Sequence, residues 1–178
     1  MARAIPAGST LGDRIMKVNH AGEHGAISIY SGQIFMARLR APAMVDELRQ
    51  FRSHEEEHRE IFGTELLRRG KPRCRSYFLC GLGGWALGLI TGLLGRQAIA
   101  ATTVTVERVV LGHLEEQLRR LRGIDGAACE AISRIVEDEQ QHHDQSALHL
   151  DAGKFWSRVL SPIVSASTEA VIWIGMRF

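Results

Sequence analysis

The chain has little proline, little cysteine and almost no excess of either charge. Its 178 residues include four prolines and three cysteines, and the formal net charge is +2. Few prolines and few alternating polar and apolar runs favour helices over strands. A net charge this small gives no reason to expect a nucleic-acid partner. We therefore expect one all-α domain over residues 1–178, long enough to bury its own core.

Neither the cysteines nor the N-terminus carries a pattern typical of export. Cys74, Cys80 and Cys129 are odd in number and lack metal-binding spacing, which is typical of reduced thiols in a reducing compartment. Residues 1–10 contain neither the apolar core of a secretory signal nor an Arg/Ser-rich amphipathic presequence. We expect a bacterial cytoplasmic chain, or one that has already been trimmed.

Apolar residues recur at helical spacing over most of the chain. Four stretches show the pattern: 11–39, 43–69, 97–122 and 127–151. Helix-ending residues follow the first three: Ala41-Pro42, Gly70-Lys71-Pro72 and Gly123-Ile124-Asp125-Gly126. A further stretch, 155–178, has Pro162 near its start, and either caps the bundle or extends an apolar surface. The pattern predicts four long helices and an extra C-terminal helix.

The long connection between the second and third helices is hydrophobic. Ser76–Gly95 contains twenty consecutive residues without a charge, which is long enough to span a bilayer. Six of the twenty are glycines, which weaken a continuous helix. Three interpretations stay open: a hydrophobic hairpin packed on the protein, a segment lying in a membrane interface, or a true span. We favour a membrane-interface segment over 76–95.

The sequence contains two Glu-x-x-His pairs: Glu55/His58 and Glu139/His142. At this spacing a carboxylate and an imidazole lie on one face of a helix. Each pair follows a lone glutamate by 32 residues, Glu23 or Glu107, and the whole set repeats with an offset of 84 residues. In each hairpin the turn lies about sixteen residues after the lone glutamate and about sixteen before the pair. Both helical segments are therefore about 24 Å long, and the lone glutamate lies at the same height in the bundle as the pair.

Two such hairpins packed together place four glutamates and two histidines around one centre, which is the set that ferritin-like two-metal proteins use. Four carboxylates buried without a metal would repel one another. Carboxylate plus imidazole with open positions suits redox-active iron better than zinc. The sequence therefore predicts a two-iron centre in a ferritin-like four-helix bundle of two internally repeated hairpins. It leaves open which glutamates bridge the ions: Glu107 and Glu139, or Glu23 and Glu55.

Several neighbours of these six residues need separate interpretation. Four histidines flank the six but fall on other helical faces, which indicates supporting or surface positions: His20, His24, His54 and His143. Tyr30 returns to the helical face of Glu23 and either lines a pocket or belongs to the core. His113 is a further candidate for a supporting position, and Glu56 and Glu57 are expected to face solvent.

Short motifs around the six residues carry a family resemblance: 19–26 with 29–33, 55–58, 105–107 and 138–144. In content and order they resemble the four ligand motifs of the demethoxyubiquinone hydroxylases, over roughly residues 11 to 178. The resemblance implies that the catalytic, iron-binding residues are the same six: Glu23, Glu55, His58, Glu107, Glu139 and His142. Leu114 stands where some members have a tyrosine, so no electron-transfer role is carried over to it.

The resemblance implies a monooxygenase of ubiquinone biosynthesis that hydroxylates the ring of a polyprenylated demethoxyubiquinone or demethoxyubiquinol. It implies two iron ions (Fe2+/Fe3+), O2 as co-substrate and NADH as electron donor. With the prenyl tail along 76–95, the enzyme would lie peripherally on the cytoplasmic side of the bacterial inner membrane. An exposed apolar face favours a homo-oligomer, and eukaryotic members act with a lipid-binding partner protein.

Other functions compete with this one. A ferritin-like tRNA-modifying hydroxylase needs a concentrated basic surface, whereas the basic residues here are spread over the helices. A peroxide-reducing or iron-storage protein has no need for twenty uncharged residues. A metal-free helical membrane protein is the remaining alternative.

Overall fold

The computed structural model describes residues 9–151 and 155–177, so most of the segment 1–10 lies outside it. Within these two ranges the chain is all-helical and contains no strand. The helices are α1 Leu11–Arg40, the short 3-10 helix η1 Pro42–Met44, α2 Val45–Arg68, α3 Tyr77–Leu94, α4 Arg96–Leu121, α5 Gly126–Ser133, α6 Val136–Ala147 and α7 Phe155–Gly175. The all-α prediction is confirmed.

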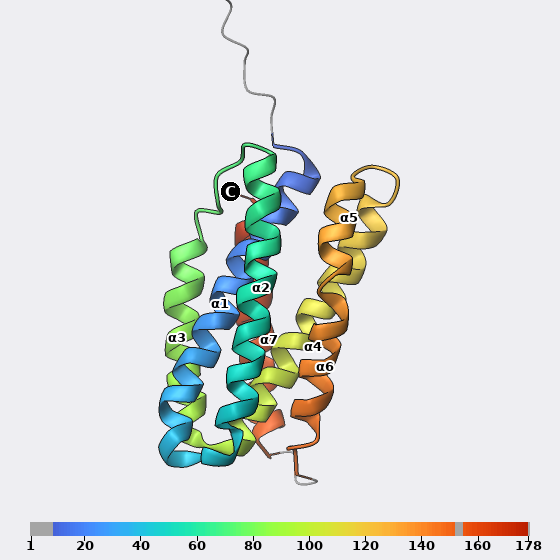
Figure 1. Cartoon of the computed structure of the whole chain (residues 1–178). Coiled ribbons are helices and arrows are strands. Elements are labelled where there is room, and N and C mark those ends of the chain that lie inside the picture. Colours follow the sequence, from blue (N-terminus) through green and yellow to red (C-terminus); the bar gives the residue numbers. More distant parts are fainter. Residues whose placement is uncertain (1–8, 152–154, 178) are drawn as a thin grey trace, which may run out of the picture.

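Two antiparallel helix pairs form the bundle (Figure 1). α1 packs on α2 across the tight η1 turn, where Pro42 occupies a first-turn position that tolerates its missing N–H. α4 packs on α6, and α7 packs mainly on α4, behind the other helices in this view. The ferritin-like four-helix arrangement with an extra C-terminal helix is confirmed. The internal repeat of the two hairpins stays a prediction.

The predicted fourth helix over 127–151 is wrong in one respect, because the structure divides it into α5 and α6. At the junction the N–H of Ile135 donates to the carbonyl of Ile132, a bond over three residues that tightens the turn. Both isoleucine side chains are fully buried in the same apolar cluster, which also contains Leu114 and Leu121. Burial of both side chains accounts for a break that the helical periodicity does not show.

The uncharged segment is one continuous helix, α3, so the hairpin interpretation is wrong. α3 lies along α1 on the outside of the bundle (Figure 1). Its buried glycines face α1 so closely that a Cβ at Gly84 would overlap the carbonyl of Gly25, and one at Gly88 the carbonyl of Ile29. The glycines therefore serve close helix packing, which offsets their low helix propensity.

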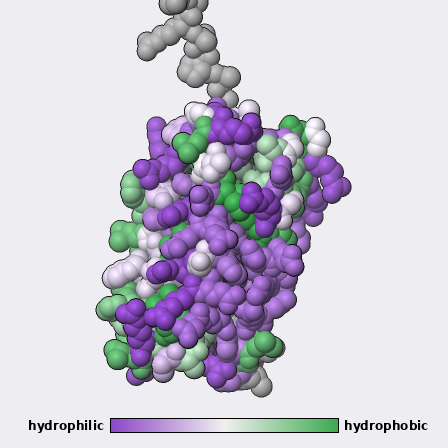
Figure 2. All heavy atoms as spheres, in the orientation of Figure 1, coloured by the Kyte–Doolittle hydropathy of each residue, from purple (hydrophilic) through white to green (hydrophobic). Residues whose placement is uncertain are grey.

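Several apolar side chains of α3 and α7 face outward: Phe78, Leu79, Leu82, Trp85 and Ile90 from α3, and Phe155, Ile163 and Trp173 from α7. We call these the apolar face. Figure 2 shows a mostly hydrophilic surface over α2 and α6, with apolar residues at the edge where α3 lies. α3 is the one helix in the described ranges that is long and apolar enough to cross a membrane, by length and composition alone.

An ion network holds one end of the bundle together. The Arg69 guanidinium at the end of α2 donates to both Asp125 oxygens, at 2.7 and 2.8 Å, and Asp125 caps α5. Asp13, in the capped first turn of α1, contacts Arg69 at 3.4 Å and Lys71 at 3.0 Å. Burial alone would raise the pKa of Asp13, but hydrogen bonds from Thr10, Lys71 and Arg69 outweigh it and lower the pKa to about 2.

We expect Gly88→Ala to destabilise the protein by about 1–3 kcal/mol, because the new methyl group meets the α1 backbone at Ile29. Gly83→Ala is the matched control, since nothing lies within 4 Å of its added Cβ. The control should leave stability unchanged or raise it by up to about 1 kcal/mol through helix propensity. Urea unfolding measures both, and equal effects of the two substitutions would contradict the glycine-mediated packing.

We expect Asp13→Asn to destabilise the protein at neutral pH and to lose this effect in acid. The folded-state pKa of Asp13 is lowered from 3.8 to about 2, so its ionised form stabilises the fold above pH 3.8. That contribution is lost as the pH falls from 3.8 to about 2. Urea unfolding of the metal-free wild-type and Asp13→Asn chains over this pH range measures the difference in their free energies of unfolding. A difference that does not shrink in acid would count against the ion network.

Candidate metal centre

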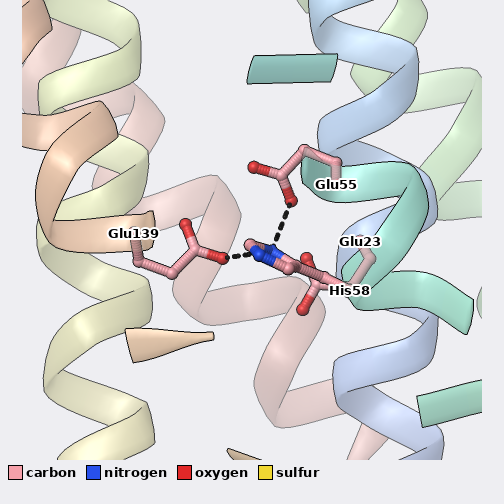
Figure 3. A group of neighbouring side chains, drawn as sticks. All are labelled: Glu23, Glu55, His58 and Glu139. Carbon is pink, nitrogen blue, oxygen red and sulfur yellow. Dashed lines mark ion pairs between the residues drawn. The ribbon is translucent and has the colours of Figure 1, made fainter. Parts of the chain in front are cut away.

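All six predicted residues meet in the middle of the bundle. Glu23 comes from α1, Glu55 and His58 from α2, Glu107 from α4, and Glu139 and His142 from α6. None of the six is more than 6% exposed. Figure 3 shows four of them, Glu23, Glu55, His58 and Glu139, pointing toward one another from three helices. The structure therefore brings all six residues together from four helices.

The six residues divide into two overlapping groups of four. One group contains Glu23 and His58, the other contains Glu107 and His142, and both contain Glu55 and Glu139. Within each group, one potential ligand atom per residue lies within 4.8 Å of the others. We call Glu55 and Glu139 the shared glutamates. The arrangement offers two adjacent metal positions with the shared glutamates between them.

The two histidines take mirrored orientations. Nδ1 of His58 lies 3.2 Å from Glu139 and 3.7 Å from Glu55. Nδ1 of His142 lies 3.2 Å from Glu55 and 3.7 Å from Glu139. Each imidazole therefore presents Nδ1 to the carboxylates and directs Nε2 outward.

Several buried atoms at the centre lack hydrogen-bond partners. Among the described residues, the oxygens of the shared glutamates and Nδ1 of His58 and His142 form no hydrogen bond, although ion pairs of 3.2 Å bring them together. Buried polar atoms without partners are costly, and buried charges are normally paired or bound to a metal. These six atoms are oxygens and imidazole nitrogens, which suit iron, so the residues fit a metal centre.

The six groups shift one another's pKa. Burial and the shared glutamates raise the pKa of Glu23 and Glu107 well above the usual range. Burial also acts to raise the pKa of the shared glutamates, but the two imidazoles outweigh it and lower both values. Burial alone would lower the histidine values, yet the carboxylates raise the pKa of His58 to about 12 and of His142 to about 9. The centre therefore carries protons that compete with a metal ion.

Three residues outside the six support them directly. His58 Nε2 lies 3.0 Å from Asp138, and His142 Nε2 lies 3.0 Å from His54. The Tyr30 hydroxyl donates to Glu107 at 2.7 Å, so Tyr30 is both a core residue and part of the site. The predicted supporting position of His54 is confirmed. Residue spacing within the sequence assigns no role to Asp138, although its place before Glu139 matches that of His54 before Glu55.

The other neighbours lie away from the six. His20 and His24 stack on Tyr77, and His143 pairs with Asp144. His113 pairs with Glu169 of α7 instead of a residue of the centre. Glu56 and Glu57 are exposed, as predicted.

An apolar cavity of about 390 Å³ lies beside the centre, between α1, α3, α4 and α7. All four glutamates reach its wall, which otherwise consists mainly of glycine and aliphatic side chains such as Ile29, Leu87 and Val110. A buried amide pair, Asn19 and Gln117, forms one polar side through two hydrogen bonds of 2.8 and 3.0 Å. A mostly apolar molecule in this cavity would reach the carboxylates with little water present.

A larger hollow of about 760 Å³ lies against α2 and the loop that follows it. Its wall is mostly charged and polar, and it contains none of the six clustered residues. Proximity to the carboxylates therefore makes the smaller, apolar cavity the candidate substrate site.

Known proteins are similar in sequence to this chain over nearly its full length. A family model described as ubiquinone biosynthesis protein COQ7 matches residues 10–175. The chain is 32% identical to the 3-demethoxyubiquinol 3-hydroxylase of Rhodospirillum rubrum, over 97% of this chain and 81% of the relative. It is also 32% identical to the proteins of Dictyostelium discoideum and Homo sapiens named NADPH-dependent 3-demethoxyubiquinone 3-hydroxylase, mitochondrial, over 93% of this chain and 76% and 77% of theirs. Because the match runs from α1 to the end of α7 and includes all six clustered residues, the chain belongs to the COQ7 family of ubiquinone biosynthesis proteins.

Proposed function

We propose that this protein is a di-iron monooxygenase that hydroxylates the ring of a polyprenylated demethoxyubiquinol or demethoxyubiquinone. The observation that carries the proposal is a buried set of four glutamates and two histidines on the wall of an apolar cavity. The hydroxylase names of its relatives support the same reaction. Neither a tRNA-modifying nor an iron-storage function accounts for an apolar cavity that reaches the carboxylates.

The proposed ligands are the six clustered residues. The shared glutamates, Glu55 and Glu139, would bridge the two ions, because both belong to each group of four. Glu23 with His58 would complete one ion's coordination, and Glu107 with His142 the other's. This choice of bridges differs from both pairs that the sequence left open. Bound iron would supply the activation of O2.

The chain's own residues would bind and orient the substrate ring. The aliphatic wall of the cavity would hold the quinol ring beside the carboxylates and exclude water. The Asn19–Gln117 pair offers the polar ring substituents one hydrogen-bonding side. Tyr30 holds one oxygen of Glu107 and so limits the rotation of that carboxylate. A reduced nicotinamide nucleotide would supply the electrons: the family resemblance implies NADH, whereas two relatives are named for NADPH.

The apolar face supports the proposal that the protein attaches peripherally to a membrane. Phe78 and Leu82 of α3 are each 71% exposed, and Ile163 of α7 is 63% exposed. The cavity lies between α3 and α7, so a prenyl tail could pass from a bilayer to the centre. Each buried CH₂ of that tail contributes about 0.8 kcal/mol. We place the enzyme on the cytoplasmic side of the bacterial inner membrane, where the same face would also receive a second copy or a lipid-binding partner protein.

His142→Ala should lose iron and activity, because it removes a ligand, whereas loss of only an outer partner already costs 10–100-fold in metal affinity. The matched control is His143→Ala, one residue along α6, which pairs with Asp144 away from the centre. Iron per chain and rescue of a ubiquinone-deficient strain blocked at the hydroxylation step are measured, with the quinones identified by mass spectrometry. A full iron complement in His142→Ala would overturn the ligand assignment. An iron-loaded wild-type chain that fails to rescue would overturn the substrate.

Metal binding at pH 7 should release two or more protons, because the pKa values of His58 and His142 are raised to about 12 and about 9. Because the metal binds the deprotonated groups, its apparent affinity rises with pH. The rise levels off only when the pH exceeds the pKa values of the two histidines. For two protons the slope is about a hundredfold per pH unit. Calorimetry in buffers of different ionisation enthalpy measures the release. Binding without proton release would show that the histidines are not ligands.

A further inference from the structure

The 84-residue offset that relates the six clustered residues extends to their supporting residues. His54 and Asp138, which stand directly before the shared glutamates, are 84 residues apart. Tyr30 and Leu114 have the same separation. At these positions the two halves of the centre carry chemically different residues.

The first difference concerns the histidines. Each directs Nε2 to the residue that precedes the shared glutamate of the opposite hairpin, at 3.0 Å in both cases. With Nδ1 bound to a metal, Nε2 carries the proton and donates it. For His58 the partner is the Asp138 carboxylate, and for His142 it is Nδ1 of the His54 imidazole. A carboxylate acceptor makes its histidine the stronger ligand, because the charge-assisted hydrogen bond increases electron density on the ring.

The second difference concerns the lone glutamates. Tyr30 donates a 2.7 Å hydrogen bond to Glu107, which holds one oxygen of that carboxylate in place. Its counterpart Leu114 is buried and has no hydroxyl to donate to Glu23. The two halves therefore differ at the lone glutamate as well as at the histidine, and the acceptor of each histidine decides the order of binding.

We propose that the two halves of the centre bind metal with unequal affinity, so that the ion held by Glu23 and His58 binds first and the ion held by Glu107 and His142 binds second and leaves first. This inference rests on the proposed two-metal function. Loss of such a partner costs 10–100-fold in metal affinity, so a partner of different charge should separate the two binding steps.

The test is a titration of the metal-free, full-length chain with Mn2+, which prefers carboxylate ligands and gives a paramagnetic signal. Calorimetry counts the binding steps, and the electron paramagnetic resonance spectrum separates isolated ions from coupled pairs. At one equivalent the wild-type chain should show mainly isolated Mn2+, and at two equivalents a coupled pair. The two affinities should differ by at least about tenfold.

His54→Asp should strengthen only the second step by about 10–100-fold and merge it with the first. An aspartate has the required length, because Asp138 makes the same contact at the equivalent position. Ser53→Asp is the matched control, since it adds the same charge at an exposed neighbouring position. Asp138→Asn should weaken the first step by a similar factor, because a neutral oxygen replaces the carboxylate.

The outcomes separate the two proposals. Two metal-binding steps that shift in the variants as described would support unequal affinity of the two halves. Two equal sites in the wild-type chain, or a His54→Asp variant indistinguishable from Ser53→Asp, would overturn it while the two-metal centre stands. Binding of fewer than two ions per chain would overturn the proposed function as well.

Discussion

Four carboxylates and two imidazoles lie in the middle of an apolar bundle, and this burial of charge is the constraint on which the rest of the structure depends. The shared glutamates and the two histidines contribute six buried atoms without hydrogen-bond partners among the described residues. Such atoms are costly unless an ion binds them. The helices around them must therefore be rigid enough to keep these groups together.

The rigidity comes from close packing on one side and from ion pairs at one end. Glycines on α3 let that helix approach the backbone of α1, which closes the outer wall of the bundle. Arg69 connects the start of α1, the end of α2 and the start of α5 through Asp13 and Asp125. Between these restraints the bundle leaves a cavity of about 390 Å³ at the carboxylates. The same α3 that encloses the centre contributes exposed apolar side chains and part of the cavity wall, so it connects the apolar face with the carboxylates.

The near symmetry of the centre is broken where the supporting residues differ. The six clustered residues follow the 84-residue offset in type, and the 3.2 and 3.7 Å contacts of the two histidines mirror each other. The supporting residues follow this offset in position but not in type. Asp138 stands at the position equivalent to His54, and Leu114 at the position equivalent to Tyr30. The two halves of the cluster therefore share their inner residues and differ in the residues that contact them.

The sequence alone determined the all-α class, most helix boundaries and the six clustered residues. It could do so because helical periodicity is local, and because equal distances to a turn bring two residues level without any knowledge of packing. Only the tertiary structure decided the features that depend on contacts between distant segments. The break between α5 and α6, the continuous α3, the shared position of Glu55 and Glu139, and the contacts of Asp138 and Tyr30 belong to this class. Each of them arises from packing between helices, to which residue spacing within one helix is insensitive.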